Sequence, residues 1–153
     1  LPFLSDFGTT IDGTTQPGFG QNGNYQPQII LDGSNNTWSI PINAIWIRAD
    51  FCKIFGLQIV GFPDDAIDIY ASQFITIGGV NKGNVIYGNG IGQDEFPSVP
   101  NSGPWEGCGI VLRQGSSNCE IIGNIIGTDY SENLVAPNEY CGIIHTSRVC
   151  SYS

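Results

Sequence analysis

The chain contains 153 residues, of which 41% are hydrophobic and only 12% are charged, and its formal net charge is −9. It is too rich in Ile, Val and Phe to be a disordered chain, and its acidic balance excludes the basic surface through which proteins bind nucleic acid. No apolar run approaches the roughly 18 residues of a membrane span. The 21 glycines lack the triplet period of collagen, so they indicate many turns between short strands.

Several features favour an extracellular or cell-surface protein. Five cysteines suit an oxidising compartment. Asn35 begins an Asn-Asn-Thr sequon and is therefore a predicted glycosylation site. The sequence has no methionine, even at position 1, which indicates a processed product or a piece of a longer protein.

Short alternations of apolar and other residues follow one another along the chain, as half-buried β-strands do. They occur at 45–47, 67–69, 75–77 and 110–112, and Gly, Asn, Asp and Ser separate them. No apolar stripe with a period of 3.6 residues predicts a helix. We therefore expect an all-β chain that forms one domain over residues 1–153.

The strand segments also recur at regular intervals, which is typical of a solenoid. The recurrences are 12–14 with 32–34, 44–47 with 66–69, 55–59 with 77–81, 88–92 with 123–127, and 108–110 with 141–143. A base step near 22 residues predicts roughly six to seven short coils. Longer steps predict loop insertions at about 93–107 and 129–140.

Two stretches are more distinctive than the rest. Thr-Ile-Asp-Gly-Thr-Thr-Gln-Pro-Gly-Phe at 10–19 is followed by Ile-Leu-Asp-Gly-Ser at 30–34, and Gly-Asn-Ile-Ile-Gly-Thr-Asp occupies 123–129. Together they resemble the repeats of large microbial secreted and surface proteins over nearly the whole chain. The resemblance implies a right-handed parallel β-helix and an extracellular location, and it implies little about chemistry.

In a parallel β-helix, equivalent residues of successive coils stack in columns about 4.8 Å apart. The alignment predicts which side chains point inward and which point outward. The inward columns are Ile45, Ile67, Ile110 and Ile143, and then Ile47, Ile69, Leu112 and His145; the outward columns are Trp46, Asp68, Val111 and Ile144, and then Arg48, Tyr70, Arg113 and Thr146. Asn89 and Asn124 are expected at equivalent turns, as a ladder of hydrogen-bonded amides. His145 is expected to be a partly buried terminal residue and not a ligand.

The same alignment places cysteines on neighbouring coils. Cys108 and Cys141 fall at equivalent positions and are predicted to form a disulfide. Cys119 and Cys150 become neighbours if the last coil is two residues shorter. Cys52 aligns with Phe74 and is expected to be a small buried hydrophobe, with a bond to another chain as the alternative.

One cluster would suit an enzyme acting on polysaccharides. Asp64, Asp65 and Asp68 lie in a turn and on an outward strand face, and Arg113 stands on a neighbouring coil. The Asp-Asp pair faintly resembles the acidic motif of polygalacturonases, but the second Asp motif, the Gly-His-Gly and the Arg-x-Lys of that family are missing. Such an enzyme would be an inverting hydrolase or a lyase that uses calcium and a basic residue. Otherwise no metal or cofactor is expected.

The function predicted first is therefore that of an extracellular structural or adhesive solenoid subunit. If the chain is complete, unpaired strand edges at both ends of the solenoid favour stacking of copies end to end into a filament. If it is a piece of a longer β-helix, neighbouring coils cover those edges instead. Surface polysaccharide is a second expected partner, through the aromatic and basic side chains of Trp46, Arg48 and Tyr70. The alternative is the polysaccharide lyase or glycoside hydrolase with the four residues above.

Overall fold

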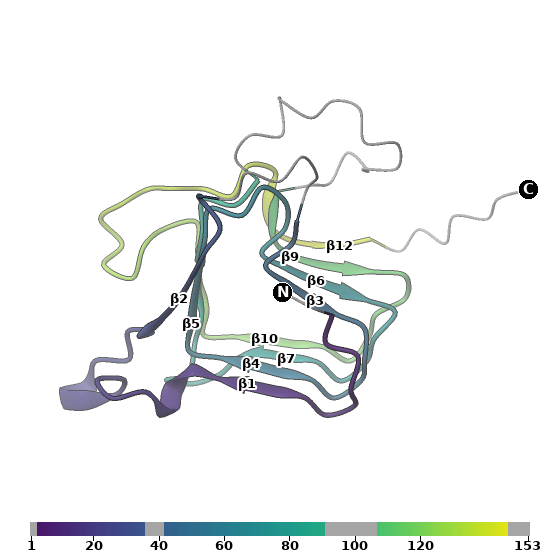
Figure 1. Cartoon of the computed structure of the whole chain (residues 1–153), viewed down its shortest axis with the longest axis horizontal. Coiled ribbons are helices and arrows are strands. Elements are labelled where there is room, and N and C mark those ends of the chain that lie inside the picture. The colour runs from purple at the N-terminus through teal and green to yellow at the C-terminus, as the bar shows by residue number, and fades with distance from the viewer. Residues whose placement is uncertain (1–2, 36–41, 91–106, 147–153) are drawn as a thin grey trace, which may run out of the picture.

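The computed structural model describes residues 3–35, 42–90 and 107–146. Within these ranges the chain forms a parallel β-helix of three sheets, each with four parallel strands, so the predicted fold class is confirmed (Figure 1). Two short 3-10 helices, η1 (Gly13–Thr15) and η2 (Gln21–Gly23), lie outside the sheets. No helix of the described ranges is long and apolar enough to cross a membrane.

The strands follow one another through the three sheets in a fixed order. Sheet 1 contains β1 (Thr10–Asp12), β4 (Lys53–Phe55), β7 (Thr76–Gly78) and β10 (Glu120–Ile122). Sheet 2 contains β2 (Ile29–Asp32), β5 (Leu57–Val60), β8 (Val85–Tyr87) and β11 (Ile125–Ile126). Sheet 3 contains β3 (Ile45–Ile47), β6 (Ile67–Tyr70), β9 (Cys108–Arg113) and β12 (Cys141–His145).

The described part of the chain makes four coils, each with one strand from every sheet, and not the expected six to seven. The step of 20 residues between 12–14 and 32–34 joins β1 to β2, which belong to different sheets of the same coil. A true coil is longer and less regular: Ile45 and Ile67 pair 22 residues apart, but Ile67 and Ile110 pair 43 apart. Loops cause the variation, and 127–140, between β11 and β12, contains the expected second insertion. The first expected insertion, at about 93–107, lies almost entirely outside the described residues.

The core consists of apolar side chains stacked from coil to coil, and the register of sheet 3 is the predicted one. Ile45 pairs with Ile67, Ile67 with Ile110, and Ile110 with Ile143. The first three are at most 1% exposed. Ile143 is 48% exposed, which corrects the expectation that the whole column is buried. It belongs to the last described coil, where no further described strand covers it. His145 pairs with Leu112 and is exposed for the same reason.

In sheet 1 the predicted register is wrong by one residue. Lys53 pairs with Thr76, so Cys52 lies beside Ile75 and not beside Phe74. Five residues separate Ile47 from Lys53, but six separate their partners Ile69 and Thr76, and Ala71 takes a left-handed conformation among those six with φ 50°. One added residue moves every following side chain to the next position of the column.

Asparagine ladders stabilise the turns, but their members differ from the predicted pair. Asn84 Nδ2 donates to Asn124 Oδ1 (2.9 Å), and Asn89 Nδ2 donates to Asn138 Oδ1 (2.9 Å). Asn89 and Asn124 therefore belong to two separate ladders. Their sequence contexts look alike because both follow a Gly at a strand end, where the backbone turns sharply.

Candidate functional site

The acidic cluster predicted from the sequence forms on the outer face of sheet 3. The alternation of β6 turns Ile67 and Ile69 inward, so Asp68 and Tyr70 face outward. Tyr70 pairs with Arg113 at the end of β9 on the next coil. From that position the Arg113 guanidinium reaches Asp68 and also Asp65, which precedes β6.

Arg113 joins two carboxylates at once. Its Nη2 lies 2.7 Å from Asp65 Oδ2, and its Nε lies 3.3 Å from Asp68 Oδ2. Asp65 Oδ1 also accepts a hydrogen bond from the backbone N–H of Cys108 at 2.8 Å, and Asp68 Oδ2 accepts one from Asn43 Nδ2 at 3.3 Å. Asp65 is fully buried and Asp68 is 3% exposed. The network therefore ties successive coils together beneath the surface.

Burial dominates the electrostatics of this network. Burial is the main reason why the pKa of Asp68 is raised to about 6; the positive charge of Arg113 opposes this rise, and the negative charge of Asp65 adds to it. Burial likewise raises the pKa of Asp65, against the hydrogen bond from Cys108 and the charge of Arg113. A low-dielectric environment disfavours the charged carboxylate, so Asp68 takes up a proton more readily than an exposed aspartate does.

Asp64 is half-buried, and its negative charge helps to raise the pKa of Arg113. An inverting hydrolase needs an acid and a base about 6.5–9.5 Å apart with a water between them. Here the carboxylates of Asp65 and Asp68 both form ion pairs with the guanidinium of Arg113. No group of three His, Cys, Asp or Glu side chains able to hold a metal ion occurs in the part of the chain that the structure describes.

The three predicted binding residues do come together. The Arg48 guanidinium carbon lies 4.3 Å from the ring centroid of Trp46 and 4.6 Å from that of Tyr70. Phe3, which the sequence did not single out, adds a third ring at 4.9 Å and packs edge-on against Trp46. Because Arg48 lies against these aromatic rings, the cluster is a cation–π contact between coils, and Phe3 is 51% exposed.

Cys108 and Cys141 lie on paired strands, but the disulfide predicted between them is not formed. Cys141 of β12 pairs with Cys108 of β9, and the two side chains are hydrogen-bonded. No disulfide is formed among the described cysteines. Cys52 is buried and Cys119 half-buried, whereas Cys150 lies outside the described residues, so its predicted pairing stays a prediction. Asn35 is exposed, as an acceptor of glycan must be.

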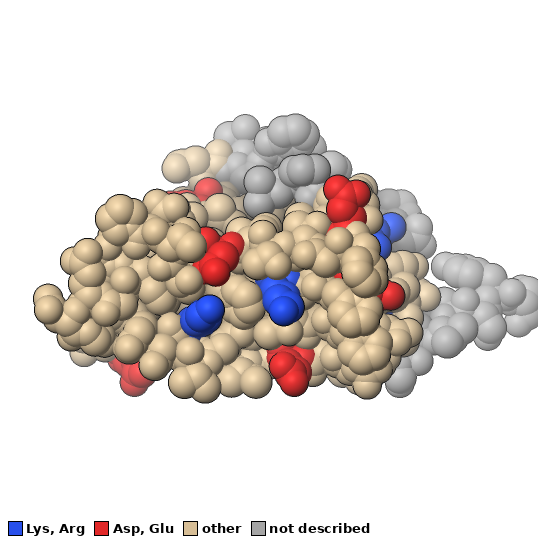
Figure 2. Space-filling view, turned by 90° about the horizontal axis from the view of Figure 1, so that it is seen from below, with Lys and Arg blue, Asp and Glu red and all other residues tan. Residues whose placement is uncertain are grey.

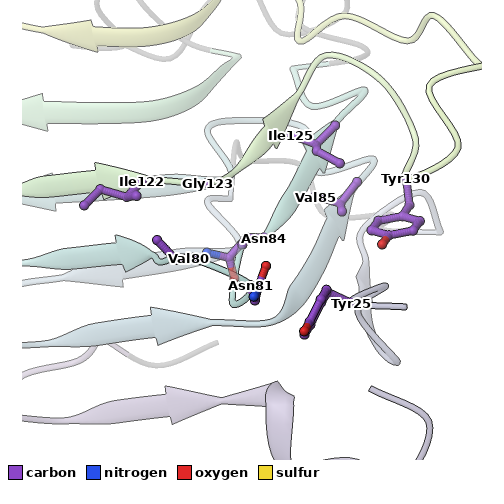
Figure 3. Close-up of a pocket in the computed structure, with 10 residues that line it drawn as sticks. Tyr25, Val80, Asn81, Asn84, Val85, Ile122, Gly123, Ile125 and Tyr130 are labelled. Carbon is purple, nitrogen blue, oxygen red and sulfur yellow. The ribbon is translucent and has the colours of Figure 1, made fainter. Parts of the chain in front are cut away.

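A groove that the sequence did not predict lies along the outer side of sheet 2 (Figure 3). It has a volume of about 390 Å³, and Tyr25 and Tyr130 line it from two separate loops. The remaining lining residues are Val80, Asn81, Gly83, Asn84, Val85, Ile122, Gly123 and Ile125. The two tyrosines lie more than 100 positions apart in the sequence, so no local pattern signals that they meet.

The outer surface of sheet 1 carries few charges. Figure 2 views the molecule from this side, and acidic and basic side chains stand singly on a largely uncharged surface. Such a face has no continuous basic platform for an acidic polymer.

Comparison of the chain with protein-family models, with curated proteins and with solved structures gave no match.

Proposed function

We propose that this protein is an extracellular structural or adhesive β-solenoid whose copies join end to end into a filament. The observation that carries the proposal is that strand edges are open in all three sheets of the last described coil and in sheets 1 and 2 of the first. Among the described residues, β1 and β2 have a strand partner on one side only, and so do β10, β11 and β12. Open edges are templates for further strand pairing.

The end faces are apolar as well as open. In the last coil Ile121 and Ile126 are half-buried and Ile143 is 48% exposed, although each continues a core column. In the first coil Ile11 and Leu31 are half-buried in the same way. Covering these side chains with the matching face of a second copy removes apolar surface from water. Each Å² of apolar surface buried in this way stabilises the contact by about 25 cal/mol.

The carboxylate network favours a scaffold over the enzyme alternative. Asp65 and Asp68 are at most 3% exposed, so a polymer bound on sheet 3 cannot contact their carboxylates without opening the coil. Their partners are Arg113 and groups of neighbouring coils. A buried ion pair of this kind holds register between coils.

Sedimentation velocity and electron microscopy of the purified chain test the proposal. We expect a length distribution that grows with concentration, and Ile143→Lys should abolish it by placing a charge on the end face. Leu134→Lys is the matched control, because Leu134 is 52% exposed on the loop between β11 and β12. A monomer at every concentration, or growth that Ile143→Lys leaves unchanged, would overturn the filament. Unsaturated products from polygalacturonate with calcium would instead support the lyase.

A further inference from the structure

The groove on the outer side of sheet 2 has the size and the chemistry of a small-molecule site. Its volume of about 390 Å³ falls within the roughly 300–1,000 Å³ of ligand pockets. Apolar side chains from successive coils form its floor, among them Val85 and Ile125, which pair in neighbouring strands. Tyr25 and Tyr130 lie beside that floor, one beyond the other along the stacking direction (Figure 3).

Both tyrosines stand on loops that are braced by their own hydrogen bonds. In the loop before β2, the backbone N–H of Gly20 donates to the carbonyl oxygen of Asn24 (2.6 Å), and the ring of Phe19 packs edge-on against Tyr25. A site whose walls are fixed before binding loses less entropy when a ligand enters.

The loop that carries Tyr130 is a closed hairpin. Asp129 Oδ1 accepts the N–H of Leu134 at 3.0 Å, and Thr128 forms an antiparallel bridge with Val135. The N–H of Ala136 donates to the carbonyl oxygen of Gly127 at 3.0 Å and closes the base of the hairpin. These contacts fix the position of Tyr130 relative to the sheet.

The polar groups of the groove are uncharged, and three of them are available to a ligand. None of the ten lining residues is acidic, basic or a histidine. Within the described part of the chain, the hydroxyls of Tyr25 and Tyr130 and the side-chain amide of Asn81 form no hydrogen bond, whereas the amide of Asn84 is fully occupied by the ladder. The groove thus combines two aromatic rings, an aliphatic floor and neutral donors and acceptors.

From these features we propose that the groove binds a neutral saccharide. A pyranose ring has an apolar C–H face, which packs on aromatic and aliphatic side chains, and a rim of hydroxyls, which pair with phenol and amide groups. An anionic ligand would find no cation in the lining and would approach a chain of net charge −9. The inference extends the adhesive role to a named ligand class, and it does not depend on end-to-end assembly.

Isothermal titration tests the site with cellotetraose, laminaritetraose, mannotetraose and chitotetraose as neutral probes and tetragalacturonate as the acidic one. All variants carry Ile143→Lys, so that assembly does not affect the result. We expect at least one neutral probe to bind with a Kd on the order of millimolar or tighter. Tyr25→Ala and Tyr130→Ala should each weaken it by about tenfold, and Tyr130→Phe by a few fold, because only the hydroxyl is lost.

Tyr140→Ala is the matched control, since Tyr140 is 47% exposed and does not line the groove. The affinity of the Tyr140→Ala variant for the neutral probe should equal that of the parent protein, which carries Ile143→Lys alone. The proposal is overturned if no neutral probe binds at millimolar concentration, if both groove variants bind as the parent does, or if tetragalacturonate binds more tightly than every neutral probe.

Discussion

Asp65 and Arg113 form an ion pair of 2.7 Å between successive coils, in which the aspartate is fully buried and the arginine side chain is 24% exposed. The carboxylate also accepts the backbone N–H of Cys108, so it connects β9 to the turn before β6 through two different groups. Removing this carboxylate takes away the acceptor of the Cys108 N–H and one of the two carboxylates that contact the half-buried Arg113 guanidinium.

We therefore expect Asp65→Ala to lower the free energy of unfolding by about 3–5 kcal/mol, the usual cost of breaking a buried pair from one side. Urea denaturation measures it. Asp6→Ala is the control: Asp6 is exposed, and surface substitutions change stability by about 0.5 kcal/mol or less. A loss below about 1 kcal/mol in Asp65→Ala would contradict the structural role given to this pair.

Asp68 predicts an unusual dependence of stability on pH. Its pKa is raised to about 6 in the folded protein, above the unfolded value of 3.8, mainly by burial. The folded state therefore binds the proton more tightly, and this contribution to stability grows as pH falls through the folded pKa.

Between pH 7 and pH 5, Asp68 should add about 1 kcal/mol to the free energy of unfolding. Asp68→Asn should flatten the profile in this window, whereas Asp6→Asn should leave it unchanged. Denaturation curves at several pH values give the slopes. Equal slopes in the wild type and in Asp68→Asn would show that Asp68 titrates as an exposed carboxyl does.

How far the sequence predicts this molecule depends on the sheet. In sheet 3 every strand carries an Ile at the same place, followed two residues later by Ile in β3 and β6, Leu in β9 and His in β12, and the four strands pair in the predicted register. In sheet 1 the extra residue near Ala71 shifts the register, and no composition signal marks it. The predicted number of coils is too high because Gly-rich strand ends have similar sequences in every sheet, so two strands of the same coil were counted as two coils.

The candidate site shows the same division. Asp65, Asp68 and Arg113 were brought together correctly because all three lie within or beside strands whose columns could be aligned. The burial of these side chains does not follow from the alternation of apolar and polar residues, which predicts an outward, exposed position for Asp68. The groove was missed because Tyr25 and Tyr130 stand on loops, whose path over the sheet follows from tertiary contacts and not from a period.

The asparagine ladder provides a third prediction. Asn84 Oδ1 accepts the N–H of Leu57, and its Nδ2 donates to the carbonyl oxygen of Ile54 and to Asn124. Asn84→Ala should destabilise the protein by about 2–4 kcal/mol, because buried backbone groups lose their partners. Asn133→Ala, on an exposed loop, is the control. Thermal unfolding compares them, and similar melting temperatures for the two variants would contradict the role of the ladder.

The last prediction concerns Cys108 and Cys141, which face each other across parallel strands. Residues paired in this way have Cα atoms about 5 Å apart, within the range of disulfides. Burial raises the pKa of both thiols, so little thiolate is present in the folded protein at neutral pH. Oxidation should therefore proceed during folding and only slowly afterwards.

Protein refolded with a glutathione redox buffer should contain the Cys108–Cys141 disulfide, detected by peptide mapping without reductant. The bond closes a loop of roughly 33 residues and should raise the free energy of unfolding by about 3–4 kcal/mol. Addition of reductant should remove this gain in the wild type and have no effect on Cys141→Ser. Cys52→Ser is the matched control, since Cys52 is buried beside Ile75 and should not alter the bond. A different pairing of Cys108, or a fully reduced pair after oxidative refolding, would contradict the juxtaposition of β9 and β12.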